Sequence, residues 1–245
     1  MQSIRLLSGI GDKGPACMQL TVDDRIWLLD CGFGPEANAH FDPAWLEGAE
    51  AVFITHDHID HIGGASHAVE AGLPIYATTQ TAKALPPAAN VHLLPEQGQT
   101  AINGVTLTTG RNGHAMGGVW FHFDLGEGLF YSGDWSEESD WFTFDVPPPA
   151  ATAILDCSYH LDDVPQSDRF EALNALLDRV EGQVLLPVPP SGRAGEMALH
   201  LVRRYGCESV MLDPECQDTL RGALSSGAVS ADAHLIAPLL DFFFF

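Results

Sequence analysis

One short segment of the sequence concentrates side chains that bind metal ions. Residues 56–61 read His-Asp-His-Ile-Asp-His, so three imidazoles and two carboxylates fall within six consecutive positions. In an extended loop residues i and i+2 point to the same side, so His56 and His58 are spaced to hold one ion through nitrogen ligands that zinc prefers. Asp60 and His61 follow at the expected start of a helix and can point at a second ion. A solvated loop with Asp60 as a helix cap is the alternative interpretation, but the crowding of histidines favours metal.

The elements around this loop must bring it to the edge of a sheet. Ala51 to Thr55 is a continuous apolar run that ends in a polar residue, as expected for a buried strand that delivers its C-terminal end to a site. Asp60 to Ala71 then has helical character. Asp23 and Asp24 predict a hairpin turn, and Gly126 to Gly128 predict another. Further strands are expected at Ser3 to Leu7, Cys17 to Val22, Ile26 to Cys31, Pro74 to Ala77, Val105 to Thr109, Val119 to Leu125 and Leu129 to Ser132.

The pattern changes to alternating strands and helices from Thr152 onward. Strands are expected at Thr152 to Asp156, Gln183 to Val188 and Ser209 to Leu212, with helices at Asp168 to Val180 and Gly195 to Tyr205. Sheets that open the chain and helices that must cover them predict an α/β fold, a layered αββα sandwich with functional loops at one sheet edge. We expect a single domain over residues 1–245, with residues 151–245 as an α/β C-terminal part.

Several segments together carry a family resemblance. The segment Thr55 to Gly64, Thr-His-Asp-His-Ile-Asp-His-Ile-Gly-Gly, resembles the signature of the metallo-β-lactamase superfamily. Three other segments match further motifs of that family in order: Leu28 to Gly32, Asn112 to Gly118 and Tyr131 to Trp135. The resemblance implies that His114 is a third histidine ligand, that Asp134 bridges two metals and that Asp30 supports the site. Taken alone, His114 would be an ordinary loop histidine and Asp134 an ordinary turn residue.

The later motifs are similar to those of the β-CASP branch, which includes RNA-processing and DNA-repair nucleases. Asp156-Cys157-Ser158-Tyr159 and Ser191 to Glu196 resemble two further motifs of that branch, which implies roles for Asp156 and Arg193 at the site or on the substrate. The amides and guanidinium at Gly192-Arg193 could receive an anion, and a plain helix N-terminus is the alternative.

The chain also departs from the β-CASP pattern. That branch carries a long inserted domain and later histidine motifs, whereas this chain stops soon after Asp213, so the resemblance implies an abbreviated relative. The first candidate for the last metal ligand is His234, and His160 and His200 stand behind it. A solvent-exposed or core histidine is the alternative for His234.

The resemblance implies hydrolysis with two Zn²⁺ or other divalent transition metals. Asp134 would bridge the ions, and Asp60 would orient the attacking water or accept its proton. A phosphodiester is the favoured substrate. Two other functions stay open: hydrolysis of an ester, thioester or lactone, and a non-catalytic metal-binding scaffold.

The charge balance limits which phosphodiesters are expected. Only 11 Lys and Arg stand against 33 Asp and Glu, a net charge of −22, which opposes attraction to duplex DNA or an anionic membrane. Of Arg193, Arg203 and Arg204, helical spacing leaves only Arg193 able to reach a phosphate at the site. We therefore expect small phosphodiesters or short single-stranded nucleic acid as partners.

Other features predict the state of the cysteines, the cellular location and the role of the C-terminal residues. Five scattered cysteines without a CxxC pair indicate buried free thiols. The N-terminus lacks a basic region followed by an apolar core, and no apolar run reaches about 18 residues, so a cytoplasmic protein without a membrane segment is expected. Phe242 to Phe245 need burial, and docking onto the domain or onto a second subunit of a homodimer is left open.

Overall fold

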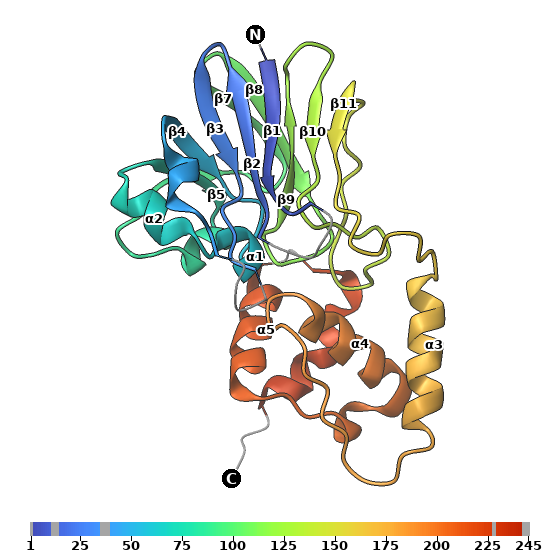
Figure 1. Cartoon of the computed structure of the whole chain (residues 1–245). Coiled ribbons are helices and arrows are strands. Elements are labelled where there is room, and N and C mark those ends of the chain that lie inside the picture. Colours follow the sequence, from blue (N-terminus) through green and yellow to red (C-terminus); the bar gives the residue numbers. More distant parts are fainter. Residues whose placement is uncertain (1, 11–14, 35–39, 227–228, 242–245) are drawn as a thin grey trace. The chain divides into compact units, whose positions relative to one another are not determined.

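The computed structural model describes residues 2–10, 15–34, 40–226 and 229–241, and the chain divides into two compact units (Figure 1). The first unit comprises Met1–Ser136 and Phe142–Asp156, and the second comprises Glu137–Trp141 and Cys157–Phe245. The longer segment of the second unit therefore begins a few residues after residue 151, where the C-terminal part was expected, and the unit also takes in Glu137–Trp141. A single domain over the whole chain stays a prediction.

Two sheets form the first unit. The six-stranded sheet runs in chain order through β1 (Gln2–Ser8), β2 (Cys17–Val22), β3 (Arg25–Leu29), β4 (Ala49–Phe53), β5 (Pro74–Thr78) and β6 (Asn90–Leu94). Its first three strands are antiparallel, and β3 to β6 are parallel. The five-stranded sheet has the order β11 (Thr152–Ile154), β10 (Leu129–Tyr131), β9 (Val119–Phe123), β8 (Val105–Arg111) and β7 (Gly98–Ile102). The strand expected at Thr152 is thus part of this second sheet, where it pairs in parallel with β10.

The apolar run of β4 exists because both of its faces are buried. Ala51 and Phe53 pack into the core between the two sheets, where Phe53 contacts the rings of Trp27 and Phe123. Val52 packs on the other face of the sheet, beneath the short helices α1 (Ile59–Ile62) and α2 (Ala65–Glu70) and the 3₁₀ turns η1 (Pro43–Leu46) and η2 (Thr81–Ala84). A strand covered on both faces reads as a continuous apolar stretch. This arrangement of sheets and helices confirms the expected αββα class (Figure 1).

Local turn chemistry was predicted with mixed success. Asp23 and Asp24 have φ values of 48° and 69°, the left-handed pair of a tight hairpin turn, as expected. The helical character expected over Asp60 to Ala71 is confirmed as α1 and α2, with a break at Gly63 and Gly64 that the sequence did not predict. Gly64 donates its N–H to the carbonyl of Cys31 at 2.6 Å, and a Cβ at Gly64 would meet that oxygen at 2.7 Å. A close approach of another segment therefore divides the helix.

The described part of the second unit is helical. It contains α3 (Gln166–Leu177), α4 (Arg193–Tyr205), η3 (Cys207–Ser209), α5 (Pro214–Ser226) and η4 (Ala231–Asp241). The two predicted helices are confirmed as α3 and α4, whereas α5 and η4 were not predicted. Gly195 of α4 packs on the buried ring of Trp141, where a Cβ would lie 2.3 Å from the indole.

The strands expected at Gln183–Val188 and Ser209–Leu212 are wrong. Neither range contains a strand, although all of its residues are described. Leu185 is 90% exposed and Met211 is 64% exposed, so these apolar residues lack a neighbouring layer to cover them. A β-strand needs a hydrogen-bonding partner, and an apolar run does not supply one.

The remaining expectations concern thiols and the chain ends. All five cysteines are free. Cys17, Cys31 and Cys216 are buried as expected, but Cys157, in the irregular segment after β11, is exposed and Cys207, in η3, is half-buried. No helix in the described ranges is both long and apolar enough to cross a membrane. Phe242 to Phe245 lie outside the described residues, so a docking role for this tail stays a prediction.

Candidate metal centre

The carboxyl ends of two parallel strands place the first half of the centre. Asp30 follows β3 and Thr55 follows β4, and these strands are neighbours in the six-stranded sheet. His56 and His58 continue from β4 in an extended segment, and α1 then carries His61. Because parallel strands end at the same sheet edge, the histidines and the Asp30 carboxylate meet there.

Asp30 is the hub of this half and is fully buried. Its Oδ1 accepts the backbone N–H of Thr55 at 2.8 Å, and its Oδ2 accepts the Thr55 hydroxyl at 2.9 Å. Oδ2 also lies 2.8 Å from Nδ1 of His61 and accepts the hydroxyl of Tyr131 at 2.7 Å. Asp30 has a φ of 57°, a left-handed conformation that aspartate and asparagine adopt more readily than most residues. The carboxylate thereby fixes the orientation of the His61 ring.

Loops of the five-stranded sheet supply the second half. His114 lies in the loop between β8 and β9, and Asp134 lies in the loop that follows β10. Gly133, next to Asp134, has a φ of 53°, and a Cβ there would meet the Thr55 side chain at 2.8 Å. The sharp turn at Gly133 therefore brings Asp134 close to the histidine loop.

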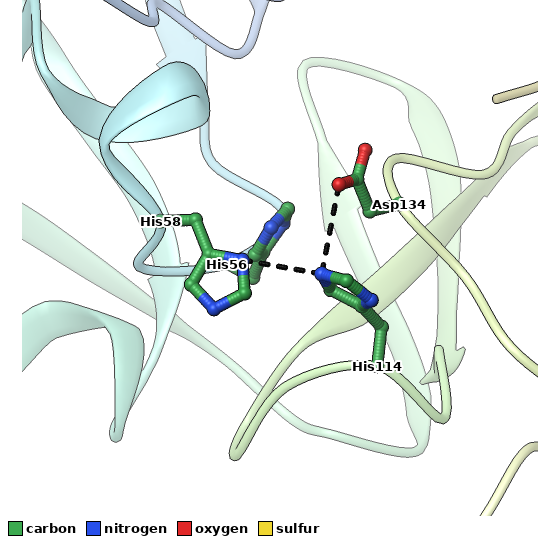
Figure 2. A group of neighbouring side chains, drawn as sticks. All are labelled: His56, His58, His114 and Asp134. Atoms are coloured by element: carbon green, nitrogen blue, oxygen red, sulfur yellow. Dashed lines mark hydrogen bonds and ion pairs between the residues drawn. The ribbon is translucent and has the colours of Figure 1, made fainter. Parts of the chain in front are cut away.

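The four side chains of the first ligand group converge (Figure 2). His56, His58, His114 and Asp134 each offer one ligand atom, and these atoms lie within 4.8 Å of one another. Nδ1 of His58 is 3.1 Å from Nε2 of His114, which is 3.5 Å from a carboxylate oxygen of Asp134. Two nitrogens on one tetrahedral zinc, with Zn–N near 2.0 Å, would be about 3.3 Å apart. The spacing therefore suits one shared ion.

A second ligand group adjoins the first and shares one member with it. Asp60, His61 and Asp134 also place ligand atoms within 4.8 Å of one another. Nε2 of His61 lies 3.0 Å from Oδ1 of Asp134. Asp134 thus belongs to both groups, which is the position that a bridging carboxylate requires.

Burial and charge set the protonation of these groups. Burial lowers the pKa of His56 well below its usual value, with help from the neighbouring imidazoles, and burial also lowers the pKa of His58. Burial opposes the charge on His61, but Asp30 and Asp134 on either side raise its pKa well above the usual value. Burial would raise the pKa of Asp134, yet the hydrogen bond from His61 and the nearby imidazoles lower it. His56 and His58 are therefore neutral beside an ionised Asp134, the form that a divalent cation needs, whereas His61 would have to release its proton to bind one.

An orphaned nitrogen indicates that these residues fit a metal ion. Nε2 of His56 is buried and has no hydrogen-bond partner among the described residues, while its Nδ1 lies 3.0 Å from the Thr55 hydroxyl. Buried polar atoms are almost always satisfied. A cation bound by His56 Nε2 would satisfy it, and a hydrogen bond to the other ring nitrogen is the usual way to orient a metal-binding histidine.

Comparison with known proteins agrees with this geometry. Residues 25–187 match the family model of the beta-lactamase superfamily domain. This chain belongs to the metallo-β-lactamase superfamily. A solved structure of a protein of unknown function from Enterococcus faecalis V583 shares the fold, with a TM-score of 0.58, 16% identity, and coverage of 91% of this chain and 68% of the other.

Curated relatives within the superfamily include β-CASP-type proteins. Transcription termination factor FttA of Methanocaldococcus jannaschii is 29% identical over 82% of this chain and 39% of its own length. Ribonuclease TTHA0252 of Thermus thermophilus is 31% identical over 73% of this chain and 49% of its own length. Cleavage and polyadenylation specificity factor 73 of Drosophila melanogaster is 24% identical over 81% of this chain and 35% of its own length. The chain therefore spans less than half the length of these relatives.

Among the described residues, the other residues singled out from the sequence do not belong to either ligand group. Asp156 follows β11 and donates its backbone N–H to the hydroxyl oxygen of Ser132 at 2.9 Å. This hydrogen bond joins two loops of the first unit. His234 is exposed on η4 of the second unit, and its role as a superfamily ligand stays a prediction. His160, the second alternative, is exposed. His200 stacks on Phe170 and lies 2.8 Å from the Asn174 side chain.

Arg193 already has partners within the second unit. Its guanidinium forms an ion pair with the buried Glu196 at 2.6 Å and hydrogen bonds with Gln166 and Tyr159. The N-cap position before it, Gly192, offers no side-chain cap. An anion at this helix start would have to compete with the carboxylate of Glu196, so a phosphate contact by Arg193 stays a prediction.

Three functional residues were missed from the sequence. Thr55 and Tyr131 stand inside the quoted superfamily motifs, but their roles depend on Asp30, which is 25 and 101 residues away. The third is Asn112, which hydrogen-bonds to Asp134 across 22 residues. Each of the three is a polar residue at a strand end within a motif. Because a buried polar group is almost always hydrogen-bonded, a hydrogen-bond partner was to be expected there.

Proposed function

We propose that this chain is a two-metal hydrolase of phosphodiester bonds. The observation that carries the proposal is the pair of ligand groups that share Asp134, in a chain of the metallo-β-lactamase superfamily. Two relatives support a phosphodiester as the bond that is cut, since one is a ribonuclease and the other an endoribonuclease.

Each residue of the centre has a role in this proposal. His56, His58 and His114 would hold one cation, and three imidazoles with one carboxylate favour zinc there. Asp60 and His61 would hold the second cation, with Asp134 shared between the two. When bound, two such cations lower the pKa of a shared water and polarise a phosphate oxygen. Asp60 would orient that water or accept its proton.

The charges favour a small substrate. Six of the eleven basic residues are arginines already paired with a carboxylate: Arg111, Arg169, Arg193, Arg203, Arg204 and Arg221. Long polyanions bind through several unpaired Lys and Arg that release counterions. A chain of net charge −22 with most of its cations neutralised gains little from this effect. We therefore propose dinucleotide-sized phosphodiesters or short single-stranded ends as substrates.

The test is a panel on the zinc-loaded chain: a dinucleotide, a long single-stranded RNA, a thioester and a lactone. We expect turnover of the dinucleotide, with affinity that changes by about threefold between 50 and 200 mM salt, the slope for a single phosphate contact. Tight binding of the long RNA with a loss of about 10³-fold or more over that range would contradict a small substrate. Turnover of the thioester or lactone alone would overturn the phosphodiester assignment. Absence of any turnover with both sites filled would favour a scaffold.

A further inference from the structure

The side chain of Asn112 lies between the loops that carry His114 and Asp134. Asn112 directly follows β8 and is fully buried. Its Oδ1 accepts the backbone N–H of His114 at 3.1 Å and that of Ala115 at 3.4 Å. Its Nδ2 donates to the backbone carbonyl of Asp134 at 2.9 Å. One side chain therefore contacts both metal-binding loops of the five-stranded sheet.

Only an amide side chain satisfies both loops at once. The N–H groups of His114 and Ala115 require an acceptor, while the carbonyl of Asp134 requires a donor. These demands fix which end of the amide is oxygen and which is nitrogen. Aspartate has the same shape but offers no donor, and an apolar residue offers neither group. The chemistry at this position therefore specifies asparagine.

The surrounding backbone holds the side-chain amide of Asn112 in one position. The backbone N–H of Asn112 donates to the carbonyl of Gly118 at 3.1 Å, and the backbone carbonyl of Asn112 accepts the N–H of Ser136 at 2.9 Å. A Cβ at Gly118 would lie 2.6 Å from Oδ1 of Asn112. Gly113 has a φ of 66°, and a Cβ there would meet the carbonyl oxygen of Ser136 at 2.0 Å. The amide is therefore locked before any ligand arrives.

The two halves of the centre are held by different residues. Asp30 and Thr55 contact His61 and His56 after β4, whereas Asn112 joins the loops that carry His114 and Asp134. Two of the four ligands in the first group, His114 and Asp134, come from the loops that Asn112 joins. The shared ligand of the second group comes from there as well. Movement of the Asp134 loop would change the spacing of both groups, and movement of the His114 loop would change the spacing of the first.

We propose that Asn112 is a positioning residue for both metal sites: it holds His114 for the first site and Asp134, which the two sites share. The proposal rests on the proposed metal-dependent function, because it assigns Asn112 a role in metal affinity. Residues that orient metal ligands typically contribute tenfold to a hundredfold to affinity when they are lost.

The test compares Asn112→Asp with Asn103→Asp in competition of zinc binding against a chelator. Asn112→Asp keeps the acceptor for the two N–H groups and places a carboxylate oxygen against the carbonyl of Asp134. We expect zinc binding to weaken by about tenfold to a hundredfold. Asn103 is the matched control, since it is exposed in the turn between β7 and β8, and its variant should bind zinc as the unmodified chain does.

Thermal unfolding of the metal-free proteins separates positioning from a purely structural role. If Asn112→Asp lowers the melting temperature but binds zinc within about threefold of the unmodified chain, the proposal is overturned. If that variant does not fold, Gly118→Ala provides the second test, because its methyl group displaces the amide and should weaken zinc binding in the same direction. Unchanged binding in Gly118→Ala would overturn the proposal too. Failure of the unmodified chain to bind zinc would instead reject the proposed function itself.

Discussion

Replacement of Asp134 by alanine is expected to weaken both metal sites at once and to abolish turnover. Asp134 belongs to both ligand groups, so its loss removes a ligand from each. It also removes the negative charge that offsets the repulsion between two dications at close range. We expect zinc affinity to fall by at least about a hundredfold, since a direct ligand should matter more than the residues that orient it. Elemental analysis and turnover of a dinucleotide, measured on the same preparation, test this.

The matched control is Asp124→Ala. Asp124 is exposed immediately after β9, in the same sheet, and does not belong to either ligand group. Its variant should retain both the metal content and the activity of the unmodified chain. The backbone carbonyl of residue 134 still accepts from Asn112 in Asp134→Ala, so the loop should keep its place. Full activity in Asp134→Ala would rule out the assignment of Asp134.

Replacement of Asp30 by asparagine is expected to destabilise the protein more than any other single change at the centre. The buried carboxylate contacts Thr55, His61 and Tyr131, and asparagine presents a donor where these groups need an acceptor. Loss of one partner of a buried charged pair costs about 3 to 5 kcal/mol. Asparagine also tolerates the φ of 57°, so the change isolates the carboxylate from backbone strain. Urea unfolding of the metal-free protein measures the loss.

Tyr131→Phe provides the graded comparison for Asp30→Asn. It removes a single hydrogen bond to the carboxylate and leaves the others in place, so we expect a loss of about 1.5 to 3 kcal/mol in the free energy of unfolding. Equal stability of Asp30→Asn and the unmodified chain would contradict the role of Asp30 as hub. A larger effect from Tyr131→Phe than from Asp30→Asn would contradict it as well.

The candidate metal ligands could be found from the sequence because local spacing encodes them. His56 to His61 are adjacent in the chain, and His114 and Asp134 each lie beside a glycine in a recognisable motif. The structure brings these residues together in two groups. Strand β4, which precedes His56, could also be predicted from the sequence, since a strand buried on both faces has to be apolar throughout.

The remaining features depend on contacts between distant segments. The break at Gly63 and Gly64 arises because Cys31 approaches from the segment after β3, which no helical pattern reveals. The role of Asn112 depends on a carbonyl 22 residues away. The strand expected at Gln183–Val188 failed for the opposite reason: its apolar residues were present, but a pairing strand was not. Local pattern thus predicted which side chains come together better than the hydrogen bonds that hold them.

Zinc titration of the unmodified chain tests the central claim most directly. The claim is that two ligand groups sharing Asp134 hold two cations per chain. The protein is purified without chelator, stripped, and titrated with zinc while bound metal is measured by elemental analysis. We predict saturation close to two zinc ions per chain. Saturation below one tightly bound ion per chain would contradict the account.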